Sequence, residues 1–555
     1  MRKKMFLAMA ITTAAVSLFF TASDLIGAAG SPGTALTGQV SSTEEGPMEG
    51  VLVSAKKTGS TVTITVVSDQ QGRYRFPSTK LAPGQYALSI RAVGYELDGA
   101  GAAKITAQKT ATADLKLKKT QDLASQLTSA EWIASMPGAQ QQKNIFLNCQ
   151  GCHTVERIAK SKYTADEFVQ ALSRMATYAN MSTPLHPQVR VADRSAGNSE
   201  AVRKQAEYLS TVNLSSVSSW QYALKTLPRP TGRGTRVIMT EYDLPRPTAE
   251  PHDVIVDPQG TVWYSNFGEQ YLGKLDPKTA QVTEYPVPVL KPGSPTGMLD
   301  LEPDKDGNLW LALMYQGGVA KFDKKTEKFQ MWAIPPEINN DATQQSMVMP
   351  AESHVDGKVW MTDVDRRALH RLDIASGKFD TFDLTKLLPK DRPHSAYGIK
   401  ADSQNNLYFM DFSDQNIGRI DAKTGKATLY PTPTPNSRPR RGMMDAQGRL
   451  WFAEYGGNRV GMLDTKTERI QEWEVPTPWT APYDVTIDKN GELWSGSMAT
   501  DRVVRLDPKS GQATEYLLPR STNMRRVFVD NSTTPVTFWV GNNHGAAIIK
   551  LELLD

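Results

Sequence analysis

The sequence contains few cysteines, two in 555 residues. Two thiols cannot build the disulfide framework of a small secreted domain, and they fall short of the four ligands of a structural zinc site. An excess of charge of one sign is also absent, because 63 lysines and arginines face 59 aspartates and glutamates, a net charge of +4. This near balance excludes the strongly basic surface that would indicate a nucleic acid partner.

Long hydrophobic runs are scarce as well. One apolar stretch, residues 5–20, follows three basic residues and precedes a group of small ones. This three-part layout predicts a signal peptide over residues 1–29, with an uncleaved anchor as the alternative. No other stretch is apolar enough to cross a bilayer. We therefore expect a periplasmic or secreted protein that has no transmembrane span once the signal is removed.

Both cysteines lie in one motif, Cys149-Gln150-Gly151-Cys152-His153. C-x-x-C-H is the attachment site of a c-type haem: the thiols add across the porphyrin vinyl groups, and the histidine reaches the iron. The alternatives are a redox C-x-x-C pair, half of a zinc site and a chance disulfide. The sequence shows neither further zinc ligands at matching spacing nor the βαβ context of a redox pair. It therefore predicts one covalent haem c with His153 as the proximal iron ligand.

The second axial ligand of the haem has three candidates in the sequence. Met175 lies on a predicted helix, Met181 lies in the loop beyond it, and His186 follows five residues later. A thioether sulfur would raise the reduction potential, whereas a histidine would lower it. Met175 and Met181 are the favoured candidates, and an open distal site is the remaining alternative.

Residues 34–118 predict a β-sandwich. Apolar and polar residues alternate in short stretches that turn residues separate, as in strands with one buried face. The patterns D-x-x-G-x-Y-x-F, from Asp69 to Phe76, and L-x-P-G-x-Y, from Leu81 to Tyr86, resemble the carboxypeptidase regulatory-like domain. This resemblance implies a transthyretin-like sandwich that serves as a folding or docking module.

Residues 120–212 predict helices, because apolar residues recur at three- and four-residue spacing. The C-x-x-C-H-T-x-E-R-I opening and the later F-x-x-x-L-x-R-M, from Phe168 to Met175, resemble short single-haem cytochromes c. The resemblance implies a small all-α cytochrome c domain. Proline and glycine then mark a linker over residues 213–234.

Residues 235–555 contain an internal repeat. D-x-x-G-x-hydrophobic-W recurs, as in Asp257 to Trp263 and in Asp445 to Trp451, and seven units begin near residues 247, 293, 346, 393, 438, 480 and 523. A period of about 40 to 50 residues with four short strands per unit predicts a β-propeller. The last unit lacks its outer strand, so we expect residues 240–245 to close the ring by joining it.

The propeller resembles the streptogramin lyase (virginiamycin B lyase) family. The stretch from Trp451 to Gly461 is close to the family's W-F-x-E-x-x-x-N-x-I-G blade signature. The resemblance implies magnesium-dependent opening of a cyclic depsipeptide by a histidine and a Glu-x-His pair. Glu454 matches the glutamate, but Gly456 stands in place of the histidine. His252 and His394 resemble histidines at the starts of blades, where simple hydrogen bonding between strands is the alternative to a catalytic role.

Together these patterns predict a multidomain, mainly β protein with a transthyretin-like β-sandwich, a small all-α cytochrome c domain and a seven-bladed β-propeller. The predicted function is periplasmic electron transfer through one covalent haem c, as a component of a haem-dependent oxidoreductase. The propeller would bind a redox partner protein, a periplasmic enzyme or a small-molecule substrate. A metal-dependent propeller lyase or hydrolase with Mg²⁺ is the first alternative. A non-catalytic docking protein is the second.

Overall fold

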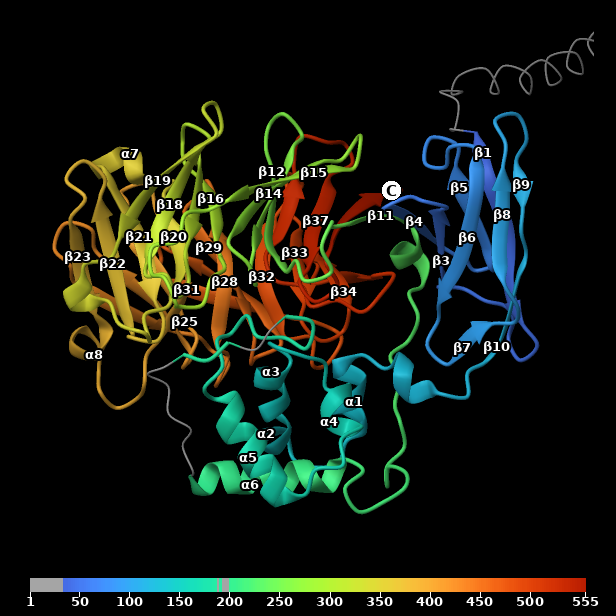
Figure 1. The fold of residues 1–555 in the computed structure, drawn as a ribbon, viewed down its shortest axis with the longest axis horizontal. Helices are drawn as coiled ribbons and strands as arrows, with labels where there is room; N and C mark the ends of the chain where they lie inside the picture. The colour runs from blue at the N-terminus through green and yellow to red at the C-terminus, as the bar shows by residue number, and fades with distance from the viewer. Residues whose placement is uncertain (1–32, 187–188, 192–198) are drawn as a thin grey trace, which may run out of the picture.

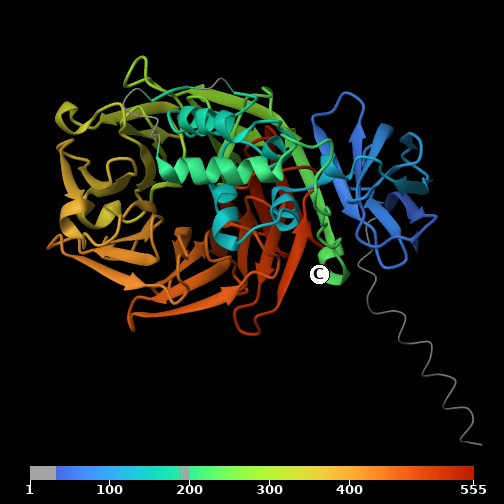
Figure 2. The same ribbon diagram turned by 90° about the horizontal axis from the view of Figure 1, so that it is seen from below.

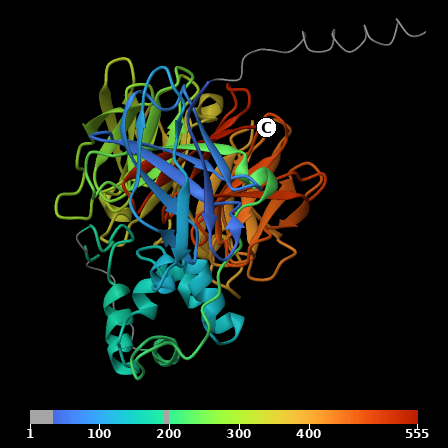
Figure 3. The ribbon, with the colours of Figure 1, turned by 90° about the vertical axis from the view of Figure 1, so that its right-hand side faces the viewer.

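The computed structural model describes residues 33–186, 189–191 and 199–555 (Figure 1). The predicted signal peptide, residues 1–29, lies outside this range. The described chain forms a β-sandwich, a ring of β-sheets and a group of short helices (Figure 1). Figure 3, viewed from the side of the sandwich, shows the helices below both β parts.

The N-terminal part is a sandwich of two sheets, at the right of Figure 1. Side chains alternate between buried and exposed along β5, so that Tyr74 and Phe76 enter the core. The predicted sandwich is confirmed. Its strands are β1 Thr34–Ser42, β2 Gly46–Pro47, β3 Leu52–Lys57, β4 Val62–Val67, β5 Arg73–Pro77, β6 Gly84–Arg91, β7 Tyr95–Leu97, β8 Gly101–Ile105, β9 Ala111–Thr112 and β10 Leu115–Lys119.

The C-terminal part is a propeller. Six of its sheets are four-stranded antiparallel meanders. Their strands are β12 Pro251–Val256, β13 Val262–Asn266, β14 Tyr271–Asp276 and β15 Gln281–Pro286; β16 Leu301–Pro303, β17 Leu309–Ala312, β18 Gly318–Asp323 and β19 Lys328–Ala333; β20 Gln345–Met349, β21 Lys358–Asp363, β22 Ala368–Asp373 and β23 Phe379–Asp383; β24 Ala396–Ala401, β25 Leu407–Asp411, β26 Asn416–Ile420 and β27 Ala427–Pro431; β28 Pro439–Met444, β29 Arg449–Glu454, β30 Arg459–Asp464 and β31 Arg469–Glu474; β32 Pro482–Ile487, β33 Leu493–Ser497, β34 Arg502–Leu506 and β35 Ala513–Leu517.

The repeated aspartate and tryptophan hold the blades together. In the fifth of these sheets the Asp445 carboxylate accepts hydrogen bonds from the backbone N–H groups of Gln447 and Arg449 and from Trp451 Nε1, at 2.9–3.0 Å. Gly448 supplies the positive φ of the hairpin turn, 78°. The same aspartate–tryptophan hydrogen bond recurs in three other blades. In the second of these sheets Asp304 holds the first position of the D-x-x-G-x-hydrophobic-W pattern and accepts from Trp310.

The last blade closes the ring with a strand from the start of the propeller. Its strands are β36 Val527–Asp530, β37 Thr537–Asn542, β38 Ala547–Leu553 and β11 Val237–Asp243. β11 pairs with β38 in antiparallel register, with Val237 opposite Leu553. This confirms the predicted closing strand. The other edge of β11 pairs with β4, with Ile238 opposite Val66, so blade and sandwich form one eight-stranded sheet.

The segment between sandwich and propeller contains short helices that lie across one face of the ring (Figure 2). They are η1 Leu123–Gln126, α1 Ser129–Ser135, α2 Gln140–Lys143, α3 Ile145–Cys149, α4 Glu156–Ala159, α5 Ala165–Met175 and α6 Glu200–Val212. The Thr164–Glu167 capping box opens α5, as the sequence predicts. Later short helices are η2 Gly232–Thr235, η3 Pro336–Ile338, α7 Ser353–Asp356 and α8 Leu384–Leu387. Within the described ranges, no helix is long and apolar enough to cross a membrane.

The predicted small all-α cytochrome c domain is wrong as a statement of fold class. The protein is mainly β, and most helices of this segment have four to seven residues. The segment has an apolar core of its own, which includes Trp132, Phe146 and Tyr208, but part of it also packs on the propeller. Leu147, Ala179, Met181 and Val191 are buried in the same apolar cluster as propeller side chains, because the β-sheet face supplies the surface that they bury against.

Candidate functional site

The C-x-x-C-H motif lies where α3 ends. Cys149 is the last residue of α3, and the Cys152 N–H donates to the Cys149 carbonyl at 3.2 Å. The two thiols are free. Burial raises the pKa of Cys149 to about 12, and burial also raises the pKa of Cys152.

The propeller holds the motif in place. Gln150 Nε2 donates to the Tyr455 hydroxyl at 3.0 Å. Asn523 Nδ2 donates to the Gln150 carbonyl at 2.9 Å, and Arg525 donates to the Gly151 carbonyl at 2.7 Å. These propeller residues come from blades that lie far from the motif in sequence. The motif loop is therefore part of the interface between the helical segment and the propeller, and these hydrogen bonds fix its position against the ring.

A cavity of about 360 Å³ adjoins the motif. His153 Nδ1 lies 2.9 Å from the Thr154 carbonyl, which can only accept a hydrogen bond, so Nδ1 carries the proton. Burial lowers the pKa of His153, which favours the neutral ring. Nε2 then keeps its lone pair, as a metal-binding imidazole requires. The cavity is lined by Cys152, His153, Thr154, Glu156, Arg157, Lys160, Thr183, Pro184, Leu185 and His544.

The three predicted distal ligands lie elsewhere. Met175 ends α5 and is 40% exposed. Met181 is fully buried among propeller side chains. His186 packs beside Gly268, and its Nδ1 atom is buried without a hydrogen-bond partner among the described residues. None of the three lines the cavity beside Cys152 and His153.

Among the predicted propeller residues, His252 is fully buried at the start of the first blade. Its Nδ1 lies 2.7 Å from the Asp253 carboxylate, and its Nε2 lies 3.1 Å from the Tyr483 hydroxyl. Burial lowers the pKa of His252 to about 3, although the Asp253 carboxylate opposes this. Both ring nitrogens are engaged, so the geometry favours a structural role.

Buried charges fill the centre of the ring, and the sequence analysis did not predict them. Arg441 donates to Asp253 at 2.8 Å and to Asp300 at 2.7 Å, while Arg526 donates to Glu302 at 3.0 Å. Burial raises the pKa of Asp300 to about 8. These residues come from separate blades. Only their places on the innermost strand of each blade could have suggested from the sequence that their side chains meet. Ion pairs therefore link the innermost strands of several blades.

Glu454 is fully buried, and neither carboxyl oxygen has a hydrogen-bond partner among the described residues. Burial raises its pKa to about 9, and the charge of Glu472 raises it further. A neutral carboxyl is a poor metal ligand. A Cβ atom at Gly456 would lie 2.4 Å from the Asn436 carbonyl, so a histidine does not fit there without backbone movement.

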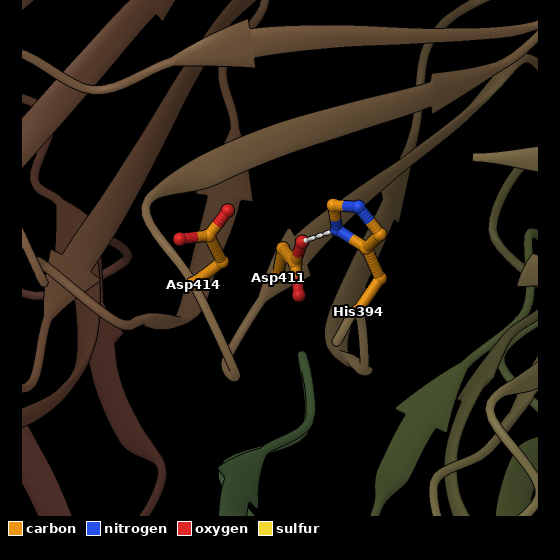
Figure 4. A group of neighbouring side chains, drawn as sticks. All are labelled: His394, Asp411 and Asp414. Atoms are coloured by element: carbon orange, nitrogen blue, oxygen red, sulfur yellow. Dashed lines mark hydrogen bonds and ion pairs between the residues drawn. The ribbon is translucent and has the colours of Figure 1, made fainter. Parts of the chain in front are cut away.

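His394 belongs to a buried cluster with Asp411 and Asp414 (Figure 4). His394 Nδ1 lies 2.5 Å from Asp411 Oδ2, and one potential ligand atom of each residue lies within 4.8 Å of the others. Asp414 accepts from Arg392 at 3.1 Å and from Asn416 at 2.8 Å. His394 Nε2 has no partner among the described residues. The arrangement is a histidine–aspartate pair at the rim of a cavity of about 410 Å³.

Sequence reasoning missed Asp411 and Asp414. Asp411 is the last residue of the second strand of its blade, and Glu454 holds the same position in the next blade. Aligning the sequences of the blades with one another could therefore have identified Asp411 as a candidate. Burial raises the pKa of Asp411, whereas its hydrogen bond to His394 lowers it.

Two family models match the chain. The carboxypeptidase regulatory-like domain matches residues 35–118, and the virginiamycin B lyase family matches residues 389–553. No curated protein matches. Neither model covers the helical segment, so the comparisons fit the propeller alternative better than the haem-protein function.

Solved structures with similar propellers include a streptogramin B lyase, with 24% identity and a TM-score of 0.49 over 58% of this chain and 100% of that one. An inactive virginiamycin B lyase variant from Staphylococcus aureus with quinupristin gives 23% identity and a TM-score of 0.48 over 57% and 99%. The extracellular domain of a putative one component system from B. thetaiotaomicron gives 14% and 0.42 over 55% and 38%.

Proposed function

We propose that this protein carries one covalent haem c on Cys149 and Cys152 and takes part in electron transfer outside the cytoplasm. Its framework is the carboxypeptidase regulatory-like sandwich and the virginiamycin B lyase-like propeller. The observation that carries the proposal is the His153 ring, whose Nδ1 proton is directed to the Thr154 carbonyl beside an adjoining cavity. This leaves Nε2 free for iron.

The residues around the cavity suit a porphyrin. Each cysteine thiol would add its sulfur to one vinyl carbon and its hydrogen to the other, so no group leaves. Arg157 and Lys160 line the cavity and offer cations for propionate carboxylates. When bound, the haem supplies a one-electron ferric–ferrous couple. The electron donor and acceptor would be redox proteins or a periplasmic enzyme that dock beside this cavity.

The test is haem content after expression with haem-maturation machinery. A pyridine haemochrome assay should find one covalent haem per chain. The double variant Cys149→Ala/Cys152→Ala should lose it, because no thioether can form. His354→Ala, at an exposed position on α7, is the matched control and should keep the haem. Covalent haem that survives the double change, or its absence from the unaltered protein, would refute the proposal.

The second candidate function is a propeller lyase or hydrolase. It is favoured by the His394–Asp411 pair, because an imidazole oriented by a carboxylate is a general base, and by the family match that covers both residues. Mg²⁺ would bind between the Asp411 and Asp414 carboxylates, and His394 would orient Asp411 through its hydrogen bond. The family's histidine is absent at Gly456, so Nε2 of His394 would have to take the proton in its place.

The test of this second function uses Mg²⁺ binding by calorimetry and turnover of cyclic depsipeptides and lactones. His394→Ala should abolish both signals, whereas His354→Ala should leave them unchanged. If the unaltered protein neither binds Mg²⁺ nor turns over these substrates, this function is ruled out.

A further inference from the structure

His544 lies in the tight turn between β37 and β38 of the last blade, where the Gly545 N–H donates to the Asn542 carbonyl at 3.1 Å. The turn faces the C-x-x-C-H motif. The His544 ring lies within hydrogen-bonding reach of the Gly151 carbonyl, which also accepts from Arg525. The most C-terminal blade and the motif are thus in direct contact although nearly 400 residues separate them in the sequence.

The Nε2 atom of His544 is shielded from solvent and has no hydrogen-bond partner among the described residues. A buried polar atom without a partner in the protein calls for a partner from outside it, such as a bound ion. An imidazole nitrogen in this position can bind a metal ion.

The cavity beside the motif joins His544 to the haem attachment residues. Cys152, His153 and His544 all line it, and a second, smaller cavity also contacts both histidines. His153 and His544 are the two histidines among the described residues that line the larger cavity. No methionine is among those lining residues. Met175 is 40% exposed and Met181 packs into the propeller core, and neither side chain lines the cavity, although Thr183 to Leu185 beyond Met181 do.

We infer that His544 is the second axial ligand of the haem, so that the iron joins the helical segment to the propeller through His153 and His544. This inference rests on the proposed function. It assigns to the propeller a direct part in the redox site, and it predicts a low-potential bis-histidine haem in place of the histidine–methionine haem that the sequence favours.

The experiment compares the spectra of the full-length holoprotein with those of His544→Ala and His544→Met. The unaltered protein should be low-spin in both oxidation states and should lack the weak long-wavelength band of a methionine–iron bond. His544→Ala should become high-spin when oxidised, and added imidazole should restore the low-spin spectrum. His544→Met should gain the methionine band and a higher midpoint potential.

The controls separate this inference from the proposed function. Met175→Leu and Met181→Leu should leave the spectra unchanged. An unaltered low-spin spectrum in His544→Ala, with one covalent haem per chain, would overturn the assignment of His544 and leave the proposed function standing. Absence of covalent haem from the unaltered protein would refute the proposed function itself. Imidazole rescue shows that a spectral change in His544→Ala reflects a vacant ligand position and not misfolding.

Discussion

At the scale of single residues, Glu454 is a carboxyl group that burial holds in its neutral form. Its carboxyl group is buried without a hydrogen-bond partner among the described residues, and burial raises its pKa to about 9. The Gly456 backbone approaches the Asn436 carbonyl too closely for a side chain. The match of the letters around Glu454 therefore does not extend to space for a histidine side chain at position 456.

Glu454→Gln should stabilise the protein increasingly as pH rises. The folded-state pKa of Glu454 lies above the unfolded value of 4.5, so the folded state binds the extra proton. Stability is therefore lost as pH rises from about 4.5 to about 9, by up to roughly 1.4 kcal/mol per pH unit. Thermal unfolding midpoints at pH 5 to 9 check this. Exposed Glu474→Gln is the control, and a Glu454→Gln difference that does not grow with pH would contradict the prediction.

The C-x-x-C-H motif could be recognised in the sequence because its residues are contiguous, but its neighbours in the fold could not. Cys149, Cys152 and His153 form one short pattern, and the haem that it predicts stays a prediction. His544 stands alone in the sequence, and only the fold brings it to the motif. The same holds for the cluster of His394, Asp411 and Asp414, whose members lie on different strands and turns of one blade.

At the scale of elements, the aspartate–tryptophan hydrogen bond was predictable because it is local. The turn, its glycine and the tryptophan lie within seven residues, and their recurrence indicates the blade period. Helix packing was harder to predict. Apolar periodicity identifies which face of a helix is buried, but it does not identify what buries it. For this reason the sequence did not show that residues such as Met181 would be buried against the propeller, in addition to the core that the helices form among themselves.

Asp445→Ala should destabilise its blade, because it removes two turn hydrogen bonds and the bond from Trp451. We expect a loss of about 2–3 kcal/mol in the free energy of unfolding. Chemical denaturation followed by tryptophan fluorescence measures it. Asp306→Ala is the matched control, since Asp306 is exposed and Asp304 makes the equivalent bond. Equal losses in the free energy of unfolding in the two variants would show that the hydrogen bonds of Asp445 do not stabilise the blade.

At the scale of the whole molecule, the shared strand β11 joins the sandwich to the propeller. It pairs with β4 on one edge and with β38 on the other, and Ile238 is buried in the core of the sandwich. Arg91 adds an ion pair to Asp501 across the two parts. Sequence patterns could predict each part and the closing strand, but no period or spacing indicates that edges of two different folds will pair.

Removal of residues 33–118 should make the remaining protein self-associate, because it exposes the β11 edge and the Ile238 side chain. Size-exclusion chromatography with light scattering should show species larger than the monomer. The same truncation with Ile238→Lys should be more monomeric, since a lysine on an edge strand opposes strand addition. A truncated protein that stays monomeric at all concentrations would contradict the prediction, because it would show that the exposed edge of β11 does not cause self-association.

The position of β11 also imposes an order on assembly. The chain is made from its N-terminus, so the sandwich and the edge of β4 exist before any blade does. β11 can dock there at once, while its partner β38 is still more than 300 residues away. The ring then closes last, onto a strand that is already fixed and covered on one side. The sandwich would act as a built-in template that shelters the closing strand during the slow formation of distant contacts.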